Sequence, residues 1–160
     1  MNTVSPTFRQ LLRNPVHFLA FGFGSCLFAK APGTAGTLLG ILAWMFLVNL
    51  SLVTYIIVIV IAALAGIYFC GKTARDLNVH DHSGIVWDEI VGIWLAMILV
   101  PVTWGWIFVS FLLFRFFDIL KPWPISWIDK NISGGIGIMA DDLLAGGFTA
   151  IVLYVTMKIL

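Results

Sequence analysis

Charged side chains are scarce in this 160-residue chain, and their scarcity is the first property that limits its class. Asp, Glu, Lys and Arg make up 11% of the residues, whereas about a quarter is usual in a soluble domain. The formal net charge of +1 leaves no basic surface for a nucleic acid. Cysteine is nearly absent, and Cys26 and Cys70 lack metal-ligand spacing. We therefore predict that both are reduced packing residues.

Hydrophobic residues are abundant instead, at 61% of the chain, and they include thirteen Phe and seven Trp. This composition is typical of a membrane protein with aromatic side chains near the membrane interfaces. No internal repeat or linker divides the chain, and its length suits one hydrophobic core. The sequence therefore predicts a single membrane domain over residues 1–160.

Five apolar segments are candidates for membrane crossing. They are Gly36–Asn49, Leu52–Gly71, Ile85–Val102, Trp104–Leu120 and Leu143–Leu160. Only the second is an unbroken apolar run of about 20 residues, the length that a bilayer core requires. The earlier apolar stretch Phe18–Ala29 is too short to span. We therefore predict an all-α, polytopic membrane helical bundle of about four to five membrane helices, preceded by an interfacial or re-entrant segment.

Charge is concentrated in alternate connections of this predicted bundle. The short turns Asn49–Ser51 and Pro101–Thr103 carry none, whereas most of the charge lies in Lys30–Thr37, Lys72–Ser83 and Lys121–Asp142. Short turns between antiparallel helices place these three polar loops on one side of the membrane. All eight acidic residues can be placed there, and so can eight of the nine Lys and Arg residues if the N-terminus joins them. The positive-inside rule predicts that this side is cytoplasmic.

Two pairs of adjacent carboxylates, Asp88-Glu89 and Asp141-Asp142, lie at the start of predicted apolar helices. A carboxylate at a helix centre in the membrane costs about 2.5–3.5 kcal/mol, so a cluster of them needs a reason. Adjacent side chains on a helix point about 100° apart, and one pair can reach different sides of one metal ion, or two ions. A single acid would satisfy the helix dipole. The glycine-rich run 134–140 before the second pair would let backbone approach a ligand closely.

Three further charged residues surround the next helix end. Arg115 and Asp118 lie at i and i+3, where they form either an intrahelical ion pair or a phosphate-binding Arg beside a metal-binding Asp. Lys121 precedes the Pro122-Trp123-Pro124 break, which stops the helix. This lysine either extends its ammonium to the membrane interface or binds the substrate.

Two polar loops provide weaker candidates. The Gly/Thr-rich turn Ala31–Thr37 enters a helix and could offer backbone N–H groups to an anion, with Lys30, Thr34 and Thr37 as candidate substrate-binding residues. The tripeptide His80-Asp81-His82 resembles a metal-ligand motif, and His82 is a further candidate for substrate binding. The turn lacks the Lys of a P-loop, and the GxGxxA match at 135–140 follows no strand. No nucleotide cofactor is therefore expected.

Together these residues suit phosphoryl chemistry at a membrane surface. The candidate metal ligands and catalytic carboxylates are Asp88, Glu89, Asp118, Asp141 and Asp142. Hard oxygen ligands favour Mg²⁺ over zinc or copper. Arg115 and Lys121 are candidates both for catalysis and for phosphate binding, because they can neutralise charge on phosphate oxygens. A substrate at the headgroup level of a bilayer would be an anionic phospholipid.

An ordered set of motifs is shared with a known family. The motifs lie at Phe21–Ser25, Pro32–Gly36, Val79–Ser83, Ile85–Glu89, Phe114-Arg115 with Asp118, Lys121–Ile125 and Gly134–Asp142. In these motifs the chain resembles the bacterial phosphatidylglycerophosphatase A family over nearly its whole length. The resemblance implies Mg²⁺-dependent removal of the terminal phosphate from phosphatidylglycerophosphate to give phosphatidylglycerol. It also implies a multi-pass protein of the bacterial cytoplasmic (inner) membrane, with its active site facing the cytoplasm.

The expected mechanism is direct hydrolysis, in which the carboxylates hold Mg²⁺ and a water attacks the terminal phosphate. No Cys-x5-Arg loop or Asp-x-Asp-x-Thr motif supports a covalent route, although attack by an Asp stays open. A phosphatidyl or phosphoryl transferase is the runner-up, and a metal-ion transporter or a catalytically silent subunit is less favoured. The number of metal ions, the identity of the general base and the oligomeric state are not determined by the sequence.

Overall fold

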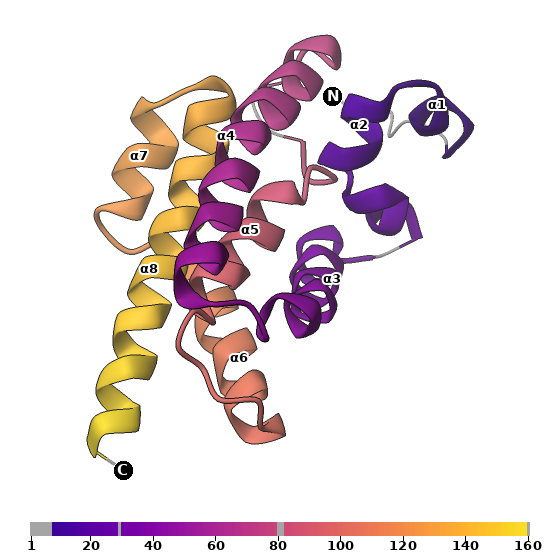
Figure 1. Cartoon of the computed structure of the whole chain (residues 1–160). Helices are drawn as coiled ribbons and strands as arrows, with labels where there is room; N and C mark the ends of the chain where they lie inside the picture. The colour runs from indigo at the N-terminus through magenta and orange to yellow at the C-terminus, as the bar shows by residue number, and fades with distance from the viewer. Residues whose placement is uncertain (1–7, 29, 80–81, 160) are drawn as a thin grey trace.

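The fold was examined in a computed structural model, which describes residues 8–28, 30–79 and 82–159. Within these ranges all regular elements are helices (Figure 1). They are α1 (Phe8–Arg13), α2 (Pro15–Ala20), the 3₁₀ helix η1 (Gly22–Phe28), α3 (Pro32–Leu47), α4 (Leu52–Asp76), α5 (Trp87–Ala96), α6 (Trp104–Leu120), α7 (Ile125–Asn131) and α8 (Gly134–Ile159). The predicted all-α class is thus confirmed for the described residues.

Two of the described helices, α4 with 25 residues and α8 with 26, are long and apolar enough to cross a membrane. The predicted segments correspond to α3, α4, α5, α6 and α8, but α3, α5 and α6 have only 16, 10 and 17 residues. A helix rises about 1.5 Å per residue, so α5 covers only about half of a bilayer core. The predicted count of four to five membrane helices therefore stays a prediction.

The predicted segment Ile85–Val102 was too long at both ends. Its first residues do not join α5 because the Val86 backbone N–H donates to the Ala20 carbonyl oxygen of α2 at 2.9 Å. This bond ties the start of α5 to the N-terminal helices. The helix then ends at Ala96, before the turn that contains Pro101.

The last helix differs from its prediction in the opposite direction. Helix α8 begins at Gly134 rather than at Leu143, so Asp141 and Asp142 lie inside the helix and not ahead of it. The glycines that precede them do not form a ligand-binding loop. Gly135 instead packs against the backbone of α4 at Ile67 and Gly71, where a Cβ atom would overlap the Ile67 carbonyl oxygen. Gly135 thus serves close helix packing.

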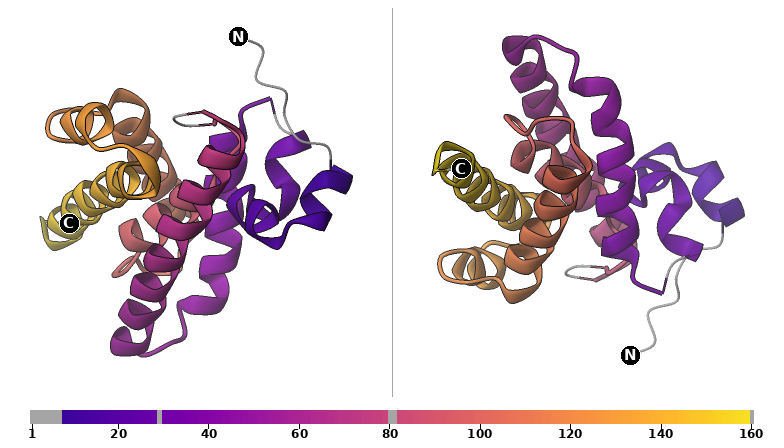
Figure 2. Two further views of the ribbon diagram at one scale, coloured as in Figure 1. Left: turned by 90° about the horizontal axis from the view of Figure 1, so that it is seen from above. Right: turned by 90° about the horizontal axis from the view of Figure 1, so that it is seen from below.

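Helix α5 is the central element of the bundle. It packs against α3, α4, α6 and α8, and most of its side chains are buried. Viewed along the bundle, the N-terminal helices lie on one side and α7 and α8 on the other (Figure 2). Cys70 is buried on α4, in agreement with its predicted packing role, whereas the side chain of Cys26 lies outside the described part.

The polar N–H and O–H groups of aromatic side chains connect α5 to its neighbours. The Trp87 indole N–H donates to the Ala62 carbonyl oxygen of α4 at 3.0 Å, and the Trp94 indole N–H donates to Gly40 of α3 at 2.8 Å. The Tyr55 hydroxyl donates to the Trp94 carbonyl oxygen at 2.6 Å. In an apolar environment each such donor would be costly to leave without a partner, so these bonds fix the position of α5.

A glycine contact sets the distance between α5 and α8. A Cβ atom on Gly146 would overlap the Gly92 carbonyl oxygen, and one on Gly92 would lie 2.8 Å from the Asp142 carbonyl oxygen. The two helices therefore touch through their backbones. Asp88 and Asp142 each lie four residues before one of these glycines, so this contact also sets the level at which the two carboxylates meet.

The N-terminal segment forms short helices that do not span. After α2, the backbone turns through Phe23 and Gly24, which have positive φ angles of 59° and 82°. His17 of α2 contacts Asp76 at the end of α4, with its Nε2 atom 2.9 Å from a carboxylate oxygen. The predicted interfacial or re-entrant role of Phe18–Ala29 stays a prediction, since Ala29 is outside the described residues.

The neighbouring glycines Gly146 and Gly147 allow a matched test of the α5–α8 contact. We expect Gly146→Ala to lower the free energy of unfolding by about 1–3 kcal/mol, because its Cβ must displace backbone. A Cβ atom on Gly147 would meet no other atom within 4 Å. Gly147→Ala should therefore be neutral or stabilising by about 0.5–1 kcal/mol. Denaturation followed by circular dichroism in detergent measures both. Equal stability of the two variants would contradict the close contact.

Candidate functional site

The centre of the candidate site is a group of three acidic side chains on two helices. Asp88 and Glu89 lie in the first turn of α5, and Asp142 is the ninth residue of α8. One carboxylate oxygen from each of the three lies within 4.8 Å of the others. Asp88 and Asp142 are buried, and the Glu89 side chain is 12% exposed. Members of both acidic pairs of the sequence are thus brought together in space.

Local backbone structure orients these carboxylates. The Asp88 side chain accepts a hydrogen bond from the Glu89 backbone N–H at 3.1 Å, and the Asp141 side chain accepts one from the Asp142 N–H at 3.0 Å. Asp88 and Glu89 also lie at the positive end of α5, which favours their negative charge. Val86 gives α5 no side-chain cap, and the Asp88 carboxylate satisfies the Glu89 N–H of the first turn instead.

Arg115 is the cation in direct contact with this group. Its Nη1 atom donates to Asp118 Oδ2 at 2.5 Å and lies 3.7 Å from Glu89 Oε1. Asp118 in turn interacts electrostatically with Glu89 and Asp142. The ion pair predicted from the Arg115–Asp118 spacing is thus confirmed. The alternative, in which Arg115 binds a phosphate and Asp118 a metal ion, stays a prediction.

The first turn of α3 closes the site on another side. A Cβ atom on Gly33 would overlap Glu89 Oε1 and would lie 3.0 Å from Arg115 Nη1. Only a glycine allows this approach, because any larger residue would displace the two charged groups. Ala31 offers no side-chain cap to α3, so the amides of its first turn form a positive end next to Glu89 and Arg115.

Lys121, at the end of α6, and Asp141, inside α8, form a separate ion-pair group. The Lys121 ammonium donates to Asp141 Oδ2 at 2.5 Å and to Asp129 Oδ1 at 2.6 Å. Burial lowers the pKa of this lysine, but its hydrogen bonds to Asp129 and Asp141 outweigh burial and raise the pKa above its ordinary value. Lys121 is therefore protonated at neutral pH. Asp141 lies against this lysine and is outside the group of three carboxylates that the structure brings together.

The remaining predicted residues are placed unevenly around the site. Thr34 is half-buried in the first turn of α3, while Thr37 is buried and its hydroxyl donates to the Gly33 carbonyl oxygen at 2.9 Å. Lys30 is exposed. His82 is buried, accepts a hydrogen bond from the Gly84 N–H at 3.0 Å, and stacks near Phe21. His80 and Asp81, the other members of its tripeptide, lie outside the described residues.

The donor set fits a hard divalent cation. Three carboxylates this close repel one another strongly at low dielectric unless a cation lies between them or protons neutralise them. Glu89 Oε2 and Arg115 Nε are both buried without a hydrogen-bond partner in the structure. An oxygen ligand and a guanidinium donor are therefore free for a cation and an anion. Oxygen-only ligands are the choice of Mg²⁺, Ca²⁺ or Mn²⁺.

Two contributions were missed by the sequence analysis. Asp129 binds Lys121 across the Pro122–Pro124 break, and no helical spacing could reveal a contact between residues on either side of a break. Gly33 was noted only as part of the Gly/Thr-rich turn Ala31–Thr37, and its role depends on a tertiary contact with Glu89 and Arg115. A glycine in the first turn of an apolar helix was the one available signal.

Comparisons with known proteins agree with the resemblance in the motifs. The family profile of phosphatidylglycerophosphatase A matches residues 18–157. A phosphatidylglycerophosphatase A of Escherichia coli (strain K12) is 44% identical over 147 residues, which cover 91% of this chain and 86% of the relative. One from Haemophilus influenzae is 44% identical over 156 residues and covers 96% of both chains.

A third relative has a different name. A protein of Bacteroides thetaiotaomicron, provisionally named a phosphatidylinositol-3-phosphatase, is 38% identical over 142 residues, or 84% of this chain and 88% of the relative. No solved structure matches this chain. The family profile covers most of the chain, and two relatives of that name match it along nearly their full length. The chain therefore belongs to the phosphatidylglycerophosphatase A family.

Proposed function

We propose that this protein is a Mg²⁺-dependent lipid phosphatase, which hydrolyses the terminal phosphate of phosphatidylglycerophosphate to give phosphatidylglycerol and inorganic phosphate. The observation that carries the proposal is the arrangement of Asp88, Glu89 and Asp142 within 4.8 Å of one another, next to Arg115. Carboxylates suited to a hard cation, with a guanidinium suited to a phosphate, are the equipment of phosphoryl transfer. Membership of the family supports the same reaction.

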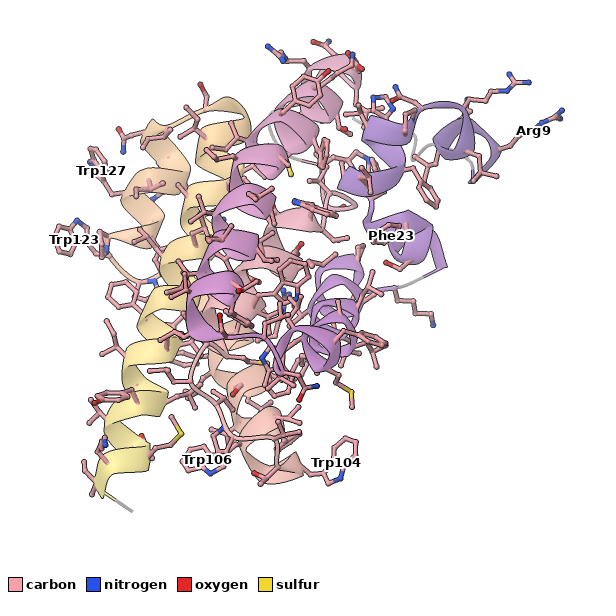
Figure 3. The ribbon with its side chains drawn as sticks, viewed as in Figure 1. Arg9, Phe23, Trp104, Trp106, Trp123 and Trp127 are labelled. Carbon is pink, nitrogen blue, oxygen red and sulfur yellow. The ribbon has the colours of Figure 1, made fainter. Side chains whose placement is uncertain are left out.

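The protein would act as a multi-pass protein of the bacterial inner membrane. Helices α4 and α8 are able to cross, and the outer face of α4 exposes Val53, Ile61 and Leu64. Exposed Trp123 and Trp127 lie beside α7, whereas exposed Trp104 and half-buried Trp106 lie at the end of the bundle that carries the C-terminus (Figure 3). Such aromatic side chains are typical of the two membrane interfaces.

The site would face the cytoplasm. Eight of the nine Lys and Arg residues precede α8 in the sequence, and the ninth, Lys158, lies in the last turn of α8. Arg9 lies at the end of the molecule away from Trp104 and the C-terminus (Figure 3). The positive-inside rule assigns the end that carries Arg9 to the cytoplasm.

Asp88, Glu89 and Asp142 would hold Mg²⁺, with Asp118 close enough to contribute through a bound water. When bound, the ion would polarise the phosphoryl oxygens and lower the pKa of a water molecule. The carboxylates would also keep that water oriented for in-line attack on phosphorus. A single general base is not assigned among them.

Arg115 and the first turn of α3 would bind the phosphate. The guanidinium already lies 3.7 Å from Glu89, and its Nε has a free donor. The backbone amides near Gly33 add partial positive charge from the other side. Lys121 and Asp141 would support the site without contacting the phosphate. Lys121 forms ion pairs with two acids and so keeps α6, α7 and α8 together.

A first prediction concerns Asp142. Phosphate release from phosphatidylglycerophosphate in detergent should fall at least about a hundredfold in Asp142→Asn, because a metal ligand and its charge are lost. The unfolding temperature of the metal-free variant should be unchanged or higher, since repulsion between the acids is relieved. Asp76→Asn is the matched control, because Asp76 is an exposed acid paired with Lys72 and His17.

Full activity of Asp142→Asn would contradict the proposed site. Lack of phosphate release by the unaltered, folded protein with any divalent metal would instead sink the phosphatase proposal. The runner-up transferase is separated by adding glycerol: a phosphoglycerol product would favour it, and inorganic phosphate alone would favour hydrolysis. Phosphatidylinositol-3-phosphate, offered in parallel, tests the headgroup suggested by the name of the Bacteroides relative.

Metal removal provides a second prediction with a physical readout. Chelation should abolish phosphate release, and Mg²⁺ should restore it. Mg²⁺ at about 100 times its dissociation constant should also stabilise the folded protein by about 2.7 kcal/mol. Glu89→Gln should lose most of this stabilisation while Asp76→Asn keeps it. If Mg²⁺ stabilises both variants equally, the ion binds elsewhere.

The contact at Gly33 yields a third prediction. Gly33→Ala should lower kcat/KM about a hundredfold, because a methyl group would push Glu89 and Arg115 apart by a fraction of an ångström or more. Gly105→Ala is the control, since Gly105 has nothing within 4 Å of its Cβ position. Both kinetic constants and the unfolding temperature should be measured. Wild-type kinetics for Gly33→Ala would show that the α3 turn has no part in the site.

A further inference from the structure

An apolar groove lies between α3 and α6 on the outer surface of the bundle. Its volume is about 560 Å³, within the range of about 300–1,000 Å³ common for small-molecule sites. Leu38, Ile41 and Leu42 line it from α3, and Trp104, Phe108 and Phe111 line it from α6. We call this feature the α3–α6 groove.

The shape of the α3–α6 groove follows from unequal burial of its lining. Ile41 is buried and forms the floor, whereas Leu42 is 59% exposed and Phe108 61% exposed, so they form the walls. Trp104 stands at the far end with 84% of its surface exposed. An apolar hollow of this size that opens to the outside of a membrane protein is suited to a hydrocarbon chain.

Helical spacing connects the groove to the candidate site. On α6, Phe111 lies four residues before Arg115, so the two share one face. On α3, Leu38 lies four residues after Thr34, in the turn next to Gly33. Both helices therefore place polar groups at one end of the groove and apolar groups beyond them. This is the polarity of a phospholipid, with its headgroup at one end and its chain at the other.

The length of the groove agrees with this occupant. Arg115 lies eleven positions after Trp104 on α6, and at a rise of about 1.5 Å per residue this part of the helix is about 16 Å long. Half of a bilayer core is about 15 Å thick. A chain that starts beside Arg115 and follows the groove to Trp104 would therefore cross one leaflet.

We propose that the α3–α6 groove binds an acyl chain of the lipid substrate while Arg115 and the first turn of α3 hold its phosphate. The groove thus selects a membrane lipid over a water-soluble phosphate ester of the same headgroup. This inference rests on the proposed lipid phosphatase function, since it assigns the part of that substrate which lies outside the reacting centre.

The test compares two substrates with one headgroup. Phosphatidylglycerophosphate with dioleoyl chains and with dihexanoyl chains is presented in the same detergent micelles at equal mole fraction. We expect the unaltered protein to have the higher kcat/KM for the dioleoyl lipid. In Leu42→Trp, which fills the groove, the ratio of dioleoyl to dihexanoyl kcat/KM should fall about tenfold or more, because several buried methylene contacts are lost.

Ile61→Trp is the matched control. Ile61 lies on α4, away from the groove, and is 62% exposed, compared with 59% for Leu42. It should leave the ratio unchanged. Leu38→Trp, a second filling substitution, should lower the ratio as Leu42→Trp does, so a folding defect peculiar to one variant cannot decide the result.

The outcomes separate the two levels of the argument. If the unaltered protein hydrolyses neither lipid, the proposed function fails. If it hydrolyses both without preference, or if both filling variants keep the ratio or lose both activities equally, the groove inference is wrong. A change of oligomeric state in both filling variants, measured by light scattering, would also overturn it, since the groove would then be an interface between copies of the chain.

Discussion

The backbone contact between Gly92 of α5 and Gly146 of α8 is the constraint on which the site depends. The two helices can approach this closely only because neither glycine carries a Cβ atom. Asp88 and Asp142 lie one turn before these glycines, so the contact brings acidic side chains from distant parts of the sequence to one level. A wider separation of α5 and α8 would leave two unrelated carboxylates in an apolar bundle, each costly to bury.

The charges of the site form two adjoining groups with different partners. Glu89 interacts with Arg115, and Glu89 and Asp142 both interact with Asp118. Asp141 instead shares Lys121 with Asp129. In the first group acids outnumber the cation, and in the second one lysine is held by two acids. The excess negative charge near Arg115 is what a divalent cation would neutralise, and the arrangement around Lys121 instead joins three helices into a rigid edge.

Much of this site could be predicted from the sequence because charged residues in an apolar chain have few reasons to exist. The pairs Asp88-Glu89 and Asp141-Asp142 indicated a shared site, and the structure brings members of both pairs together. The sequence could not show that adjacent Asp141 and Asp142 point to different groups, since helix phase depends on packing. Nor could it show that the Val86 N–H is bonded to Ala20, which shortens α5, or that Gly135 packs against α4.

The central position of the ten-residue helix α5 has a consequence for biosynthesis. Residues 87–96 leave the ribosome well before residues 134–159, yet α5 receives a large part of its cover and the third acid from α8. Until α8 arrives, Asp88 and Glu89 lack both their helical neighbour and the partner carboxylate. The order of synthesis thus makes assembly of the site a late event, completed when α8 packs against α5.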